Sequence, residues 1–326
     1  MVAAAAAAAV ALSCRPEPGV GTLVYTRSGR QHALDLANCR DRVLQPGVSK
    51  PSPFISPDGR FAATVVAKRN GNRGTNAIVL RNRSTGATRT IYRVPESYRS
   101  IPAGGPGPIM LFRWSGDGRW LFFAIDPQGS ASIAADGLLL QVISTKGGRP
   151  HRIGMTLAYS DYMTWCGGRL VFTGGGDRLA TTNKRLLVAS PPAWQARPLL
   201  ETPKRAWGSV TCAPDGRSFV AQSQPTSEDY NFFATKWELW RVGLNGSRRR
   251  LTSPPPHSAD ESPRFSRNGR SVFFVRSRHG LGSLFTLRAN GSQAHCYGSA
   301  TTSATTATVP GGSTRATCSG RRSGRG

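Results

Sequence analysis

A short turn motif recurs along this chain, and it constrains the fold more than any other feature. The motif reads apolar residue, Ser or Ala, Pro or Gly, Asp or Asn, Gly, Arg, and then an apolar strand. Its copies lie at 55–61, 114–120, 212–217 and 265–270, with a degraded copy at 165–170. Their glycines, at positions 59, 118, 168, 216 and 269, are spaced by 59, 50, 48 and 53 residues. Such a period is typical of an array of supersecondary units.

The residues of the motif explain why it would mark the edge of a sheet. Asp-Gly and Asn-Gly supply the positive φ angles of a tight hairpin turn. The strand that follows is apolar over four or five residues, as at 61–65 and 272–275, which is typical of strands buried on both faces. A second hairpin follows, with turns at 84–86, 146–148, 245–246 and 290–291. Two hairpins form a four-stranded antiparallel unit that can bury its faces only against other copies.

We therefore predict an all-β chain, a six-bladed β-propeller of four-stranded antiparallel blades whose first and last blades are degraded. The blades are expected at about 17–47, 48–105, 106–158, 159–205, 206–257 and 258–292. The first has only the strand pair 22–26 and 31–36, which would suit a blade completed by a strand from the other end of the chain. Rings of five or seven blades are the alternatives.

The two ends of the chain differ from the repeats. Residues 1–16 form a signal-peptide-like or disordered segment, because their apolar run is too short to cross a bilayer. This predicts a secreted, periplasmic or cell-envelope protein, and Cys14 offers a position for a lipoprotein anchor. Residues 293–326 are rich in Ser, Thr, Ala, Gly and Arg. They predict either a disordered tail or a reading frame that changed near residue 292.

The formal charge of +26 raises the question of a nucleic-acid partner. Only six of the 43 basic residues are Lys, a skew that a GC-rich coding sequence would produce. The arginines are scattered over the hairpins, and their longest run is Arg248-Arg249-Arg250. Nucleic-acid binders usually concentrate charge on one face and add stacking aromatics, so we expect no nucleic-acid partner. Envelope association through anionic polymers or lipid headgroups is compatible with this charge.

The motif resembles a known repeat family. Ser-Pro-Asp-Gly-Arg before an apolar strand, together with Leu-Asn-Gly-Ser and Arg-Leu-Thr within 244–252, resembles the WD40-like (PD40) repeats of TolB-like propellers. The resemblance covers roughly 17–292 and implies the propeller fold, which serves as a binding platform in unrelated proteins. About 20 residues precede the first strand, so we expect no α/β domain like that of TolB. The similar propeller of prolyl oligopeptidases implies a hydrolase domain, but the chain contains no Gly-x-Ser-x-Gly.

The six cysteines show no metal-ligand spacing. Cys166 lies two residues before its repeat glycine, and Cys212 lies four residues before its own. This even offset places both side chains on the same strand face of adjacent blades, where a disulfide could form. Two separate buried thiols are the alternative.

Candidate ligand residues lie in the loops. The repeated Asp58, Asp117, Asp215 and Asn268 could suggest a ring of metal ligands, but their coupling to Gly indicates turns, and the small residue before each turn is interpreted as blade packing. Loops with more unusual chemistry contain Asp161, Tyr162, Glu228, Asp229, Tyr230, His257, Asp260 and Glu261. These residues are expected near one mouth of the central channel, where they would suit a cationic or sugar-like ligand or a Ca²⁺ ion. Ordinary solvated loops are the alternative.

These observations predict a binding protein. Its five histidines are dispersed and form no catalytic or metal motif, so we assign no catalytic residue, no metal and no cofactor. The leading hypothesis is a monomeric, non-catalytic exported propeller that binds a protein, peptide or glycan at the channel mouth. The alternatives are a lyase or hydrolase that uses Asp161, Asp229, Asp260 or Glu261 with His257, and a decayed gene product without function.

Overall fold

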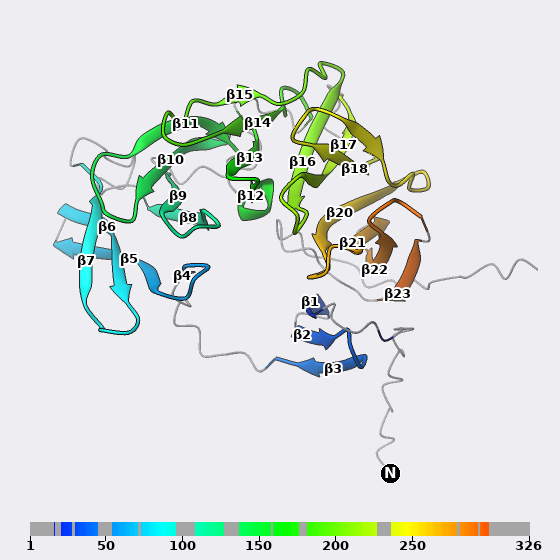
Figure 1. Cartoon of the computed structure of the whole chain (residues 1–326), viewed down its shortest axis with the longest axis horizontal. Coiled ribbons are helices and arrows are strands. Elements are labelled where there is room, and N and C mark those ends of the chain that lie inside the picture. The colour runs from blue at the N-terminus through cyan, green and yellow to red at the C-terminus, as the bar shows by residue number, and fades with distance from the viewer. Residues whose placement is uncertain are drawn as a thin grey trace, which may run out of the picture. The chain divides into compact units, whose positions relative to one another are not determined.

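The regular secondary structure of the described residues consists of β-strands and one short 3₁₀ turn (Figure 1). This computed structural model describes residues 16, 21–27, 30–44, 54–70, 73–95, 108–126, 137–157, 159–175, 181–226, 236–278, 281–292 and 294–299. The chain divides into two compact units. Unit 1 contains residues 1–48, 233–239 and 250–326, and unit 2 contains residues 49–232 and 240–249.

Four antiparallel sheets follow one another from residue 54 to residue 250. The first contains β4 (Phe54–Ile55), β5 (Phe61–Asn70), β6 (Arg73–Asn82) and β7 (Thr88–Arg93). The second contains β8 (Ile109–Trp114), β9 (Trp120–Ile125), β10 (Leu138–Ser144) and β11 (His151–Thr156). The third contains β12 (Met163–Cys166), β13 (Arg169–Thr173), β14 (Leu186–Ala189) and β15 (Arg197–Pro198). The fourth contains β16 (Arg205–Cys212), β17 (Ser218–Pro225), β18 (Glu238–Gly243) and β19 (Arg248–Arg250). In each sheet, strands adjacent in sequence are neighbours.

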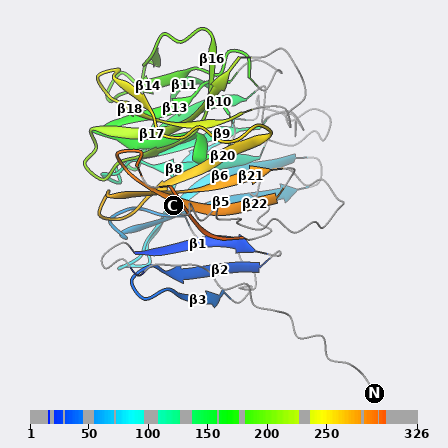
Figure 2. The ribbon, with the colours of Figure 1, turned by 90° about the vertical axis from the view of Figure 1, so that its right-hand side faces the viewer.

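Unit 1 contributes two further sheets. The first contains β1 (Thr22–Arg27), β2 (Arg30–Asp35) and β3 (Arg40–Val43), which lie beside one another in Figure 2. The second contains β20 (Ser258–Phe265), β21 (Ser271–Arg278), β22 (Leu281–Arg288) and β23 (His295–Ser299). Leu34 of β2 packs in one apolar cluster with Phe273 of β21 and Leu284 of β22. The described residues thus form five four-stranded sheets and one three-stranded sheet, which confirms the predicted all-β class.

Consecutive sheets of unit 2 pack face to face. Phe123 of β9 packs with Ile78 and Leu80 of the preceding sheet, whereas its neighbour Phe122 packs with Phe172 of the following sheet. This alternation follows from the two-residue period of a strand. The apolar runs of β9, β13, β17 and β21 are therefore buried on both faces, as their composition predicts. The run at 61–65 in β5 differs from the prediction, because it is only partly buried, with Val65 37% exposed.

The repeated turn is held by its own side chains. Ser56 Oγ donates to Asp58 Oδ1 at 2.6 Å and accepts the backbone N–H of Phe61 at 2.9 Å. The backbone N–H of Gly59 donates to the Ser56 carbonyl at 2.8 Å. The same side-chain bond joins Ser115 to Asp117 at 2.5 Å and Ser266 to Asn268 at 2.8 Å. The serines interpreted as packing residues are thus also hydrogen-bonding centres of the turns.

One detail of the turn differs from the prediction. The glycines of the four good copies have φ between +67° and +72°, and the preceding Asp or Asn residues are not among those with positive φ. The connection is therefore a four-residue loop between Ser56 and Phe61. The Asp or Asn residue stays outside the left-handed region, and its side chain holds the turn by accepting a backbone hydrogen bond, as Asp58 and Asn268 do.

Two strands lie where the apolar pattern predicts none. All four residues of β3 are exposed, and β23 pairs with β22 beyond residue 292, where a tail is predicted to begin. Edge strands like these are stabilised by backbone hydrogen bonds to one neighbour, so they need no apolar pattern. The only helical segment in the described residues is the 3₁₀ turn η1 (Ser160–Tyr162). None of those residues belongs to a helix with the length and apolar character needed to cross a membrane.

Candidate anion-binding cleft

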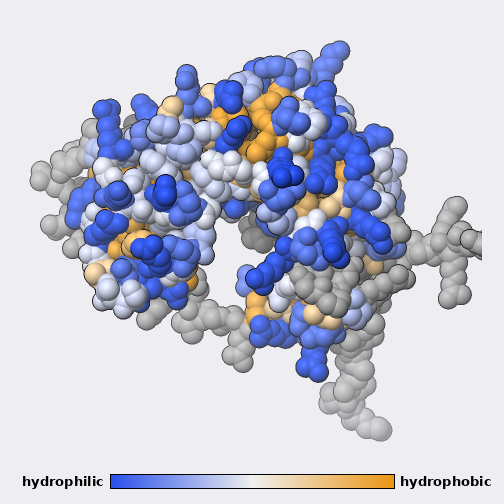
Figure 3. Space-filling view, viewed as in Figure 1, coloured by the Kyte–Doolittle hydropathy of each residue, from blue (hydrophilic) through white to orange (hydrophobic). Residues whose placement is uncertain are grey.

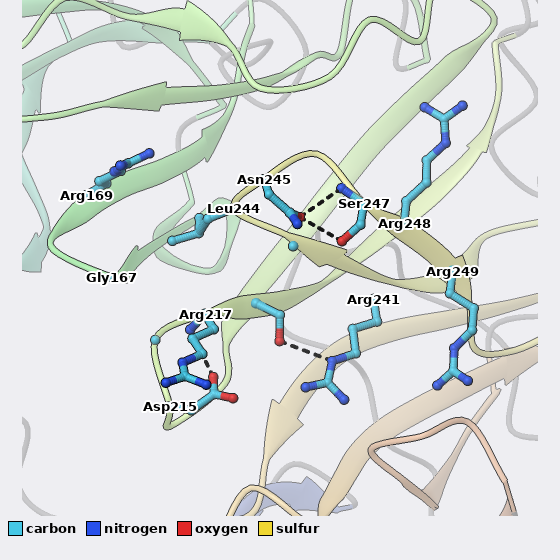
Figure 4. Close-up of a pocket in the computed structure, with 13 residues that line it drawn as sticks. Gly167, Arg169, Asp215, Arg217, Arg241, Leu244, Asn245, Ser247, Arg248 and Arg249 are labelled. Atoms are coloured by element: carbon cyan, nitrogen blue, oxygen red, sulfur yellow. Dashed lines mark hydrogen bonds between the residues drawn. The ribbon is translucent and has the colours of Figure 1, made fainter.

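An open cleft of about 720 Å³ lies in unit 2, where turns of the third and fourth sheets meet. The turn between β12 and β13 forms one wall, and the turns that follow β16 and β18 form the other. Five arginines line the cleft, namely Arg169, Arg217, Arg241, Arg248 and Arg249, together with a single acidic residue, Asp215 (Figure 4). On the molecular face seen in Figure 3, hydrophilic residues predominate.

The two walls are held in close contact by small residues. Gly167 has φ of +56°, and a Cβ at this position would lie 2.6 Å from the carbonyl oxygen of Gly216 and 2.6 Å from Leu244 Cδ1. Any larger residue would therefore push the two turns apart. The backbone N–H of Leu244 also donates to the carbonyl of Arg217 at 3.1 Å, which joins the two turns of the fourth sheet.

A disulfide joins the same two sheets beside the cleft. Cys166, directly before Gly167, is bonded to Cys212 at the end of β16, with their Cα atoms 5.4 Å apart. This is the pair that the repeat offset predicts. Cys39 and Cys296 are also disulfide-bonded.

The hairpin turn before β19 is held by hydrogen bonds between its own residues. Asn245 Oδ1 accepts from the backbone N–H of Ser247 at 3.1 Å and from its hydroxyl at 2.7 Å. The backbone N–H of Gly243 donates to the Ser247 carbonyl at 2.8 Å, and Gly246 has φ of +86°. The turn therefore positions the next two residues, Arg248 and Arg249, at the cleft (Figure 4).

The arginines enter the cleft from several directions. Arg241 Nε donates to Ser218 Oγ at 3.1 Å, which orients its guanidinium group. In Figure 4 the side chains of Arg241 and Arg249 extend toward one side, whereas Arg248 extends toward the other. Because each guanidinium group carries a positive charge, the lining is strongly positive. Five cations and one anion leave this cleft with a net charge of about +4 and suit it to an anion.

The residues predicted to form an acidic mouth are distributed over both units. Asp161 and Tyr162 lie in η1 of unit 2, where the Tyr162 ring is 5.7 Å from that of Tyr159. Burial raises the pKa of the Tyr159 hydroxyl, and the charge of Asp161 adds to this effect. In unit 1, His257 directly precedes β20, and Asp260 and Glu261 lie within this strand. Glu228, Asp229 and Tyr230 lie outside the described residues.

Asp260 is part of a buried ion pair. Its side chain is 0% exposed, and its two oxygens accept from Arg276 Nε at 2.6 Å and from Arg276 Nη2 at 2.8 Å. Burial raises the pKa of the Asp260 carboxyl, and the Arg276 guanidinium and the Thr252 hydroxyl oppose that increase. The guanidinium also lies 4.8 Å from the ring centroid of Phe285. The carboxylate is therefore engaged inside the sheet, so it is a poor candidate for ligand binding or catalysis.

The described residues contain no group of three or more His, Cys, Asp or Glu side chains placed to hold a metal ion. His257 precedes β20 with φ of +57°, a left-handed conformation that is uncommon for a non-glycine residue.

Sequence reasoning did not identify the arginine cleft. Two of its residues, Arg169 and Arg217, occupy the position after Gly in the repeated motif, and two others belong to the 248–250 run. These signals were visible, but an arginine in every repeat does not indicate which turns meet.

No protein-family model matches the chain, and no curated protein sequence matches it. Similar solved structures do exist. TolB from Acinetobacter baumannii superposes with a TM-score of 0.51 at 16% identity, over 86% of this chain and 64% of that one. The fold is a TolB-like β-propeller. The propeller also resembles prolyl oligopeptidase B from Galerina marginata, with a TM-score of 0.50 at 14% identity, over 84% of this chain and 39% of that one. The chain thus spans less than two thirds of the length of either protein.

Proposed function

We propose that this propeller is a non-catalytic binding platform for a protein, peptide or glycan, exported to the periplasm, the cell envelope or the exterior. We further propose that its ligand is anionic and binds in the arginine-lined cleft of unit 2. The observation that carries this proposal is the convergence of five arginines and one aspartate on a cleft whose walls are joined by a disulfide. Two features support the location. An export signal is predicted at residues 1–16, and the Cys166–Cys212 disulfide suits an exported protein because disulfides persist in oxidising compartments.

The cleft is a stronger candidate than the predicted acidic mouth. Its lining belongs to one unit, whereas the predicted mouth residues belong to two. Asp260, one of those residues, is already paired with Arg276. Guanidinium groups bind carboxylates and phosphates through paired hydrogen bonds, each worth about 1.5–3 kcal/mol when charge-assisted.

Binding to defined polyanions tests the proposal. Poly-glutamate and heparin would be titrated by calorimetry into the wild-type protein, an Arg217→Ser/Arg248→Ser variant and a matched Arg149→Ser/Arg152→Ser control. Both control arginines are exposed, belong to unit 2 and lie outside the cleft lining. We expect the cleft variant to bind at least one probe about tenfold more weakly, and the control to lose much less. Equal losses would show that the overall charge, and not the cleft, attracts the probe.

The same incubation tests the enzymatic alternative. A lyase or hydrolase would shorten the polymer, which gel filtration of the mixture would detect. Buried Asp260 cannot serve as its general acid or base without breaking the bond to Arg276. We expect both polymers to stay intact, and fragmentation by the wild-type protein would overturn the non-catalytic assignment.

A further inference from the structure

We propose that the ligand of the cleft is an acidic polypeptide segment that binds in an extended conformation along the outer edge of β19. This inference rests on the proposed function, because it requires the arginine cleft to be a binding site. It adds the chemical class of the partner and the way in which its backbone is recognised.

The position of β19 supports recognition of a backbone. The order of its sheet is β16-β17-β18-β19, so β19 is the terminal strand. A terminal strand presents backbone N–H and C=O groups in the spacing that an extended peptide needs. Two of the three residues of β19, Arg248 and Arg249, also line the cleft. A strand added at this edge would therefore run along one wall of the cleft.

The side chains of β19 specify the charge of that strand. Its three residues are all arginine and all exposed. Neighbouring side chains of a strand point to opposite faces of the sheet, and Figure 4 shows Arg248 and Arg249 extending in different directions. A partner with acidic residues at successive positions would meet a guanidinium group on each face.

The same charges oppose the pairing of this strand edge with the edge of a second copy of the chain. The protein carries a formal charge of +26 with 43 basic and 17 acidic residues. Two copies therefore repel each other, most strongly where three arginines would meet three arginines. An acidic strand is attracted by the same arginines that repel a second copy of the chain.

The lining favours a polypeptide over the other anions. A cleft of about 720 Å³ is far larger than one phosphate or sulfate ion, so a chain with several charges is required to occupy it. The described lining residues include no aromatic ring on which a sugar could stack, and Leu244 is their only large apolar side chain. An acidic peptide uses both features that are present, the strand edge and the guanidinium groups.

The test compares three probes of matched charge. The first, the Glu-Val peptide, is a twelve-residue peptide that repeats Glu-Glu-Val-Val, so that acidic residues occur at successive positions. The second has Pro at every Val position, and the third is a heparin oligosaccharide. Proline has no N–H to donate and cannot pair along a strand edge. Affinities would be measured by calorimetry for the wild-type protein, an Arg248→Ser/Arg249→Ser variant and the Arg149→Ser/Arg152→Ser control.

We expect the Glu-Val peptide to bind the wild-type protein about tenfold more tightly than either other probe. The Arg248→Ser/Arg249→Ser variant should lose about tenfold of that affinity, and the control should lose much less. If heparin binds through the cleft and the Glu-Val peptide does not, the proposed function stands and this inference is wrong. If the proline peptide binds as tightly as the Glu-Val peptide, strand addition is wrong. If no probe depends on the cleft arginines, both proposals fall.

Discussion

The Cys166–Cys212 disulfide offers a quantitative test of how the third and fourth sheets hold together. The two cysteines are 46 residues apart in sequence and join β12 to β16. Closing a loop of that length removes about 13 cal/mol/K of chain entropy from the unfolded state, or about 4 kcal/mol at 25 °C. This is an upper value, because an unfolded chain with residual structure has less entropy to lose.

Packing adds a smaller contribution. Cys166 is 1% exposed and belongs to an apolar cluster with Val171, Trp207 and Phe219. Replacing its sulfur with a hydrogen would remove contacts worth about 1 kcal/mol. We therefore expect Cys166→Ala to lower the free energy of unfolding by about 4–5 kcal/mol.

Denaturant unfolding of three variants separates the two contributions. Either single substitution already breaks the cross-link, so the Cys166→Ala/Cys212→Ala double variant should be only slightly less stable than each single variant. If the loss in the double variant instead equals the sum of the single losses, the two residues act independently and the cross-link reasoning is wrong. Reduction of the wild-type protein is not an equivalent experiment, because Cys39 and Cys296 are also disulfide-bonded.

Three further predictions test the turns and the buried ion pair. The Cβ of a Gly167→Ala variant would lie 2.6 Å from the Gly216 carbonyl oxygen, so this variant should lower the free energy of unfolding by about 2–4 kcal/mol. The control is Gly168→Ala, which has φ of +76° but open space around its Cβ, and it should cost about 1 kcal/mol. Equal losses in denaturant melts would contradict the close contact. Arg276→Met leaves Asp260 buried without its partner and should cost about 3–5 kcal/mol at neutral pH. Burial raises the folded-state pKa of this carboxyl above its ordinary 3.8, so the folded variant binds the proton more tightly and should regain stability as the pH falls toward 3.8; a loss that does not change with pH would argue against a buried charge. Two hydrogen bonds hold the pKa of Asp58 below 3.8, the larger effect coming from the Ser56 hydroxyl and the smaller from the Arg60 backbone N–H. Ser56→Ala should therefore raise the pKa of Asp58 in an NMR titration. The contribution of Asp58 to wild-type stability is therefore present above pH 3.8 and is lost as the pH falls through the lowered pKa, and an unchanged titration in Ser56→Ala would exclude the hydrogen bond as the cause.

Much of the fold could be predicted because its signals are local. The turn at Ser56, Asp58 and Gly59 is held by bonds that span at most five residues. The even offset of Cys166 and Cys212 from their glycines also depends only on the two-residue period of a strand. The edge strands β3 and β23 escaped prediction, because an edge strand needs no apolar pattern to pair with its neighbour.

The candidate site was much harder to predict. Asp260 looked like a ligand residue in the sequence, but its register opposite Arg276 makes it one half of a buried pair. Conversely, Arg169 and Arg217 looked like ordinary turn residues until their turns met at Gly167 and Gly216. In each case the role of the charge depends on a group that is distant in sequence or on the opposite strand.

By itself, the sequence determined the hairpins, their repetition and the need for apolar sheets to stack, since hydrogen bonds within a turn and the alternation of a strand are properties of a few adjacent residues. Only the tertiary structure decided which charged side chains are buried in pairs and which converge on a cleft. The physical reason is that desolvation and Coulomb interactions depend on distances through space, and the turns of different sheets come together only when the sheets pack.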